Sequence, residues 1–405
     1  MRALLLSPSY PSEMIGFARG LAEVGVGVWG VGDTPRHELP HAVKPYLVDY
    51  LQVPRILDEH DVMNRVSDWL RGRDVDRVLT NWEPLVVLAA RLRERWGMPG
   101  MSVDTVRGFR DKETMKERLR AAGLRVPRSR RVRTAAEARA AAEEVGFPLI
   151  LKPIAGAGSA DTYAVASPAE LEEVLPRLGN VIEASCEEYI DGDELTFDTV
   201  CMRGEPVYEN VSLYLPKPLE ASKVEWLSPI SISIRDLERP DLAGGIALGR
   251  AALQALGMQD GFTHMEWYRT SSGEAVFGEV ACRAGGAGLV DQMNYTSDID
   301  LYREWARVTC WGHFEARAPR KYNTALVFKR ARGWGNITRI EGLHGWLRAC
   351  GPWVVEERLS RPGTPRRDWK QTQRADGHIF VRHPDWDTAL DMARSAAADI
   401  QIYAQ

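Results

Sequence analysis

The stretch from Phe262 to Arg283, FTHMEWYRTSSGEAVFGEVACR, combines acidic and basic side chains in a pattern that could bind a metal ion and phosphate. Two alternating runs flank Ser271-Ser272-Gly273, which predicts a β-hairpin. Glu266 lies on the first run and Glu279 on the second. Two carboxylates on adjacent strands suit Mg²⁺, which takes one or two carboxylates together with substrate phosphates. A surface hairpin with ordinary exposed acids is the alternative.

Two lysines upstream of this hairpin could bind phosphate. Lys152 ends a short apolar strand and precedes a turn that contains Gly156, Gly158 and Ser159. Small residues leave the backbone amides of such a turn open to an anion. Lys112 opens a charged amphipathic helix. The turn lacks G-K-[ST] and is therefore not a Walker P-loop. An ordinary β-turn and a solvated helix face are the alternatives.

A third polar group, EEYIDGDE, runs from Glu187 to Glu194. An acid beside an apolar residue at a strand-to-turn junction can read the edge of adenine. The side chain would accept from the amino group, and the backbone would bond the ring. Glu194, beyond the turn, could accept from ribose hydroxyls. An acidic surface turn is the alternative.

The letters from Gly25 to Gly30, GVGVWG, have the glycine spacing of a dinucleotide-binding loop but the wrong context. They end a predicted helix and enter a strand, whereas that fingerprint follows a strand and opens a helix. This placement argues against a nicotinamide cofactor.

The composition is that of a globular protein of two to four domains, with 405 residues, 44% of them hydrophobic and 27% charged. The net charge of -4 gives no electrostatic case for nucleic acid or an anionic membrane as a partner. No apolar run approaches the length of a membrane span. Five scattered cysteines without a C-x-x-C pair indicate reduced thiols, and we expect a cytoplasmic location.

Periodicity predicts the elements that position these groups. A strand, helix and strand over residues 2–31 indicate a parallel sheet, and residues 1–108 form a small α/β domain. A charged helix from Asp111 to Ala122, a second helix capped at Thr134 and a hairpin over 195–215 come next. A helix over 242–256 precedes the acidic hairpin. Residues 216–240 are predicted to be irregular, with an apolar insert at Ile230 to Ile234.

The order of the motifs resembles the ATP-grasp superfamily. They read D-K-x-x-M-K-x-x-L-x-x-A-G from Asp111, then L-K-P with the glycine turn, E-E-Y-I-x-G-x-E, H-x-E and E-V-x-x-R, all before Gly288. The chain is most similar to the carboxylate–amine ligase branch, which includes amino-acid ligases that make dipeptides, with biotin-carboxylase-like architecture. In architecture the resemblance covers about residues 1 to 315.

This resemblance implies a role for each matching residue. Lys112 and Lys152 would contact the nucleotide phosphates under a lid formed by Gly156, Gly158 and Ser159. The adenosine would be held by Glu187, Tyr189, Ile190 and Glu194. The metal ligands would be Glu266 and Glu279. Arg283 and Lys152 would be catalytic and steady the transferred phosphoryl group. The acceptor substrate would face His264, Gly285 and Gly286, although His264 is equally explained as a packed histidine.

The implied fold is α/β (α+β). A parallel-sheet domain (1–108) would precede a two-lobed ATP-grasp fold, with a small lobe (109–190) and a large lobe (191–315). A small C-terminal α+β module (316–405) would follow. The implied cofactors are ATP and one or two Mg²⁺ ions, with Mn²⁺ as an alternative. The implied partners are a small-molecule carboxylate and an amine, and a homodimer is one option. No nucleic acid or membrane partner is expected.

The chain departs from the family pattern at Ala281, where E-x-N-x-R usually places an asparagine as a further metal ligand. Purine-pathway carboxylating enzymes of the superfamily also have alanine there. The expected function is an ATP-dependent ligase that activates a carboxylate as an acyl phosphate, joins it to an amine and releases ADP and phosphate. The alternatives are a carboxylating enzyme that uses bicarbonate, a non-catalytic nucleotide-binding protein, and a phosphotransferase that stops at the phosphorylated product.

Overall fold

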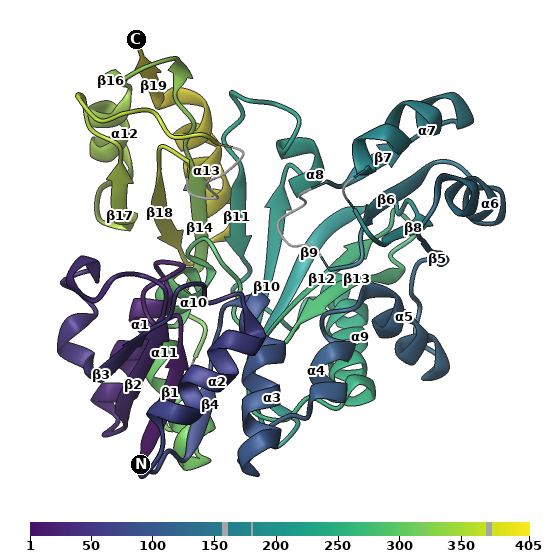
Figure 1. Ribbon diagram of the computed structural model, residues 1–405. Coiled ribbons are helices and arrows are strands. Elements are labelled where there is room, and N and C mark those ends of the chain that lie inside the picture. Colours follow the sequence, from purple (N-terminus) through teal and green to yellow (C-terminus); the bar gives the residue numbers. More distant parts are fainter. Residues whose placement is uncertain (156–160, 180, 318, 370–374) are drawn as a thin grey trace.

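The computed structural model describes residues 1–405 except 156–160, 180, 318 and 370–374, and its described residues form four β-sheets (Figure 1). The N-terminal α/β part lies at the lower left of Figure 1, the small lobe at the upper right and the chain's last residues at the upper left. The largest sheet joins these parts. The described residues contain no helix long and apolar enough to cross a membrane.

The N-terminal part is a parallel sheet in the order β3-β2-β1-β4, as the strand–helix–strand opening predicts. Four of the five residues of the first strand are buried, which explains its apolar sequence. The elements are β1 (Arg2–Leu6), α1 (Met14–Glu23), β2 (Gly27–Gly32), β3 (Leu47–Gln52), α2 (Glu59–Trp69), β4 (Arg77–Leu79), the 3-10 helix η3 (Glu83–Leu85), α3 (Val86–Trp96) and α4 (Val103–Gly108).

The next segment forms a four-stranded antiparallel sheet in the order β5-β8-β6-β7. The Asp111 side chain caps the first helix by accepting from two backbone N–H groups, and Thr134 caps the second helix as predicted. The elements are α5 (Lys112–Ala121), β5 (Ser129–Val132), α6 (Ala135–Val145), β6 (Leu149–Pro153), β7 (Tyr163–Val165), α7 (Pro168–Val174) and β8 (Ala184–Glu188).

An eight-stranded antiparallel sheet in the order β13-β12-β9-β10-β11-β14-β18-β17 forms the centre of the molecule. It runs across the predicted domain boundary at residue 315. Its first part comprises β9 (Asp193–Met202), β10 (Glu205–Leu215), α8 (Pro218–Ala221), β11 (Ile230–Ser233), α9 (Pro240–Leu256), β12 (Gly261–Arg269), β13 (Ala275–Ala281), α10 (Leu289–Ser297) and α11 (Leu301–Ala306). The predicted hairpins over 195–215 and 262–281 are both confirmed.

The prediction that residues 216–240 are irregular is wrong at β11. This strand lies in the interior of the sheet, and all four of its residues are buried. The alternation Ile-Ser-Ile-Ser explains the placement. Ile230 and Ile232 enter an apolar core, whereas Ser231 bonds Gln292 and Ser233 lies 3.0 Å from the Ser212 hydroxyl.

The C-terminal part completes the large sheet and adds a small three-stranded sheet in the order β15-β19-β16. Helix α13 packs between them, with Ala389, Ala393 and Ala396 buried in the same core. The elements are β14 (Asn323–Phe328), β15 (Arg332–Gly333), β16 (Ile337–Glu341), α12 (Leu343–Cys350), β17 (Val354–Leu359), β18 (Gly377–His383), α13 (Trp386–Asp399) and β19 (Gln401–Ala404).

Helix α1 docks the N-terminal part onto the large sheet through an aromatic cluster. The Phe17 ring packs edge-on against Phe262, Tyr302 and Trp305, with centroids 4.9 to 5.9 Å away. Gly20 allows close approach, because a Cβ there would lie 2.4 Å from the Tyr302 carbonyl oxygen.

Helix α9 offers a matched test of packing behind the acidic hairpin. A Cβ at Gly249 would lie 2.2 Å from the buried Phe197 ring, so we expect Gly249→Ala to reduce the free energy of unfolding by about 1–3 kcal/mol. At Gly244 the nearest atom, Cβ of Ala275, is 3.4 Å away. Gly244→Ala should therefore be neutral or stabilising by about 0.5–1 kcal/mol. Urea denaturation measures both variants, and equal stabilities would contradict this packing.

Candidate active site

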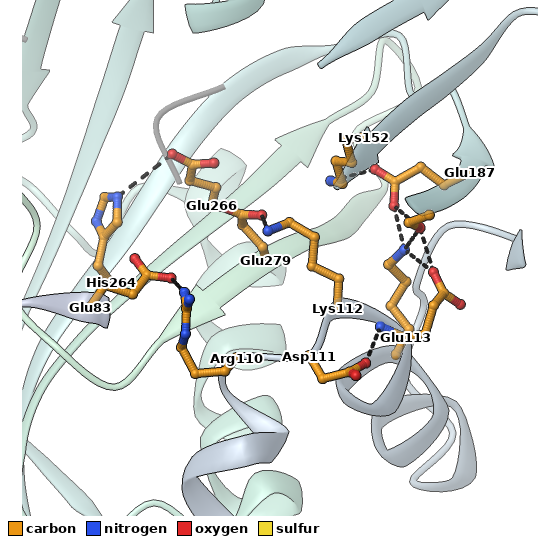
Figure 2. Close-up of polar contacts among 12 residues, drawn as sticks. Glu83, Arg110, Asp111, Lys112, Glu113, Lys152, Glu187, His264, Glu266 and Glu279 are labelled. Atoms are coloured by element: carbon orange, nitrogen blue, oxygen red, sulfur yellow. Dashed lines mark hydrogen bonds and ion pairs between the residues drawn. The ribbon is translucent and has the colours of Figure 1, made fainter. Parts of the chain in front are cut away.

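Two carboxylates face each other on the β12–β13 hairpin, where Glu266 is directly opposite Glu279 in the strand register. Their side chains are 25% and 30% exposed, so both remain open to a ligand. Alternation along β12 places His264 on the same face, with its Nε2 3.6 Å from Oε1 of Glu266. Figure 2 shows these three side chains together.

Lys112 reaches this hairpin from the first turn of α5 (Figure 2). Its side chain is 8% exposed, and its Nζ lies 3.0 Å from Oε2 of Glu279. Burial would raise the pKa of Glu279, but Lys112 and Lys152 outweigh it and hold that pKa at about 2. Glu279 is therefore ionised at neutral pH and faces two cations.

Lys152 lies near the end of β6, and its Nζ is 2.5 Å from Oε1 of Glu187 on β8. Burial disfavours the charged ammonium, yet Glu187 and Glu279 raise the pKa of Lys152 above its ordinary value. Lys112 and Lys152 thus bring two lysine side chains close to the acidic hairpin.

Arg283 makes an ion pair that the sequence did not predict. Its Nε and Nη2 lie 2.9 and 2.5 Å from Oε2 of Glu83, and Arg110 bonds the other oxygen of the same carboxylate. Burial raises the pKa of Glu83, but Arg283 and then Arg110 bring it below the ordinary value. The N-terminal part therefore contributes an ionised carboxylate to the site.

His264 is held from behind by Asp198 on β9. The Nδ1 of His264 lies 2.5 Å from Oδ1 of Asp198, and the other oxygen of Asp198 accepts from the Thr196 hydroxyl at 2.7 Å. Gly285 keeps this side open, because a Cβ there would lie 3.1 Å from the same Nδ1. His264 is therefore fixed in orientation, with its other nitrogen toward Glu266.

Glu194 lies on β9 and is 6% exposed. Burial raises its pKa well above the ordinary value, and the nearby Glu266 raises it further. A buried carboxylate on β9, just beyond the turn, fits the predicted contact with ribose hydroxyls.

For the remaining residues predicted to bind the nucleotide or the substrate, the structure gives position but does not test the role. Gly156, Gly158 and Ser159 lie outside the described residues, so the predicted lid is not described. Tyr189 and Ile190 follow β8, with Ile190 buried and the Tyr189 ring 5.8 Å from the ammonium of Lys217. Gly286 accepts a backbone bond from Leu289 just before α10. The roles predicted for these residues stay predictions.

The donor set fits Mg²⁺ bound together with a polyphosphate. No group of three or more histidine, cysteine or acidic side chains within the described residues could enclose a metal ion. Mg²⁺ needs no such group, because one or two carboxylates and substrate phosphates usually bind it. Glu266 and Glu279 would supply the carboxylates, and Lys112 and Lys152 would supply positive charge for the phosphates.

Comparisons with known proteins show which proteins this chain resembles. Residues 111–185 match the family model of the carbamoyl-phosphate synthase L chain, ATP binding domain. The L-arginine-specific L-amino acid ligase of Bacillus subtilis is 27% identical over 288 residues, which are 69% of each chain. The alanine–anticapsin ligase of Bacillus subtilis strain 168 is 24% identical over 63% of this chain and 58% of its own length.

Solved structures extend the similarity to the whole chain. The L-amino acid ligase from Bacillus licheniformis superposes with a TM-score of 0.81 at 19% identity, covering 100% of this chain and 98% of its own. N5-carboxyaminoimidazole ribonucleotide synthetase from Thermotoga maritima gives a TM-score of 0.72 at 18% identity, covering 100% and 99%. Residues 111–185 therefore match an ATP-grasp domain, and the whole chain shares the fold of ATP-grasp ligases. The ATP-grasp segment that the family model matches contains Lys112 and Lys152.

Three of the site's charged residues were not predicted. Glu83 follows the carboxyl end of β4 in a parallel sheet, which is where ligands commonly bind, and that position was an available signal. Arg110 directly precedes the D-K motif. Asp198 follows Thr196 and Phe197 in the middle of β9, and only its register opposite His264 reveals its role.

The His264–Asp198 pair predicts a pH dependence. Burial lowers the pKa of His264, but Asp198 raises it, and the result is about 9 against an ordinary 6.5. Because the folded-state pKa is the higher one, protonation stabilises the fold fully below about pH 6.5, and that stabilisation is lost as pH rises through about 9. We expect the ¹⁵N resonances of His264 to titrate near pH 9 in the wild type and lower in Asp198→Asn. Identical midpoints near 6.5 would contradict the pairing.

Proposed function

We propose that this protein is an ATP-dependent carboxylate–amine ligase. It activates an amino acid or a small acid as an acyl phosphate, joins it to an amine, and releases ADP and phosphate. The amino-acid ligases among its relatives support the substrate class. The observation that carries the proposal is the meeting of Lys112, Lys152, Glu266, Glu279 and Arg283 in one polar site.

The residues divide the work of phosphoryl transfer, which depends on positioning and charge neutralisation more than on covalent help from the protein. Lys112 and Lys152 bind and orient the phosphates. Arg283, held by Glu83, presents its guanidinium to the developing charge on the transferred group. Mg²⁺ held by Glu266 and Glu279 would neutralise the polyphosphate charge.

His264 is positioned to act on the acid rather than on the nucleotide. Its ring is protonated at neutral pH and is held between Asp198 and Glu266. A cationic donor beside the two acids can bind the carboxylate that is to be activated. We propose this role for His264, with Gly285 and Gly286 leaving room beside it.

We also propose a role for each domain. Residues 1–108 supply Glu83, residues 109–190 bind the phosphates and the base, and residues 191–315 carry the metal ligands. Residues 316–405 extend the central sheet and complete the substrate side. A pocket lined by Glu83, Arg110, Lys112, His264, Glu279 and Arg283 draws on the first three of these segments.

Product analysis tests the function directly. Purified protein with MgATP and pools of amino acids and small acids should release ADP and phosphate only when an acid and an amine are both present. With hydroxylamine replacing the amine, the acid should yield a hydroxamate. AMP and pyrophosphate would overturn the acyl-phosphate route. A requirement for bicarbonate would favour a carboxylating enzyme, and ADP without free phosphate would favour a phosphotransferase.

Glu279→Gln is expected to lower ligase turnover by roughly 100-fold or more while the protein stays folded, because one charged oxygen next to Lys112 becomes a neutral amide. Steady-state ADP release and thermal unfolding measure the two effects. Glu274→Gln on the turn of the same hairpin is the matched control, because the Glu274 side chain is 50% exposed. The turnover of this variant should be unchanged. Normal turnover in Glu279→Gln would contradict the assignment of Glu279 as a metal ligand.

A further inference from the structure

Behind Lys152 lies a buried cluster of charged side chains that no motif assigns. Lys116 on α5 is 1% exposed, although lysine side chains are almost never fully buried unless they are paired. Its three partners are Oε1 of Glu113 at 2.9 Å, Oγ of Ser185 at 2.9 Å, and Oε2 of Glu187. An ammonium has three N–H donors, so every donor of Lys116 is used within the protein.

Glu187 is held on both of its oxygens. Lys116 bonds Oε2, and Lys152 lies 2.5 Å from Oε1. Figure 2 shows Glu187 beside Lys152 and above Glu113, on the far side of Lys112 from the acidic hairpin. Burial raises the pKa of Glu187, but Lys116 and Lys152 bring it below the ordinary value. The carboxylate is therefore ionised and already paired before any nucleotide enters.

Glu113 anchors the back of the cluster. Its Oε1 accepts from both Lys116 and the Ser185 hydroxyl, and its Oε2 accepts from the Ser129 hydroxyl at 2.8 Å. Two lysines and two glutamates balance in formal charge, so each buried charge has a partner, and removing one partner would leave the other uncompensated. The chain Glu113–Lys116–Glu187–Lys152 is thus one continuous hydrogen-bonded unit that ends at the proposed phosphate contact.

We propose, resting on the function proposed above, that Lys116 and Glu187 are positioning residues that fix the ammonium of Lys152 for the nucleotide phosphates. In this arrangement the Glu187 carboxylate does not read the adenine amino group, which is the role that the family resemblance implied. Breaking the unit frees Lys152 to move and weakens phosphate binding. Contacts to the base are unchanged.

Binding measurements separate these two roles. Lys116→Met removes the charge that holds Glu187 but leaves the Glu187 carboxylate in place, and Glu187→Gln removes its charge. For each variant, MgATP affinity is measured by calorimetry and adenosine affinity by saturation-transfer NMR. We expect MgATP to bind about tenfold or more weakly to both variants, with adenosine binding unchanged, because charge-assisted hydrogen bonds to Lys152 are lost.

The control is Glu172→Gln, which breaks an exposed ion pair with Arg139 on the same lobe and should change neither affinity. An equal loss of adenosine and MgATP affinity in Glu187→Gln, with Lys116→Met unaffected, would overturn the proposal in favour of adenine reading. Unchanged MgATP binding in a folded Lys116→Met would overturn it as well. A wild type that binds no MgATP would instead overturn the ATP-dependent function, and calorimetry on the wild type alone reveals that case.

Discussion

The shared ion pair of Glu83 with Arg110 and Arg283 is the constraint on which the rest of the site depends. Burying an unpaired guanidinium costs several kcal/mol, so each of these groups requires the others. Glu83 follows the parallel sheet, Arg110 precedes the small lobe, and Arg283 ends the acidic hairpin. The three segments must dock together before their charges are satisfied, and docking them forms the proposed phosphate site between Lys112 and the hairpin.

Strand register in the antiparallel sheet determines which charged side chains of the site face each other. Register on β12 and β13 sets Glu266 opposite Glu279, and register on β9 sets Asp198 beside His264. Buried rings on the other face, such as Phe197 and Trp267, hold these strands against the glycine face of α9. Rigid strands with functional side chains on one face are suited to holding charges in place during phosphoryl transfer.

Local sequence patterns predicted much of the fold and of the acidic hairpin. The alternation around Ser271-Ser272-Gly273 correctly gave the hairpin, and with it the pairing of Glu266 with Glu279. Contacts without a local signature escaped prediction. Glu83 and Arg283 are 200 residues apart in sequence, and a helical lysine such as Lys116 resembles any solvated lysine until its three partners are known. The strand at Ile230–Ser233 was missed because four residues between irregular segments give too short a pattern, and its neighbours in the sheet define it.

The most direct test of the central claim follows oxygen from the acid. An amino acid labelled with ¹⁸O at both carboxylate oxygens is incubated with MgATP, an amine and the enzyme, and the products are analysed by mass spectrometry and ³¹P NMR. An acyl phosphate requires that one ¹⁸O atom enters inorganic phosphate while the other stays in the amide. We expect this result, with ADP unlabelled. Label in AMP, or unlabelled phosphate alongside the amide, would contradict it.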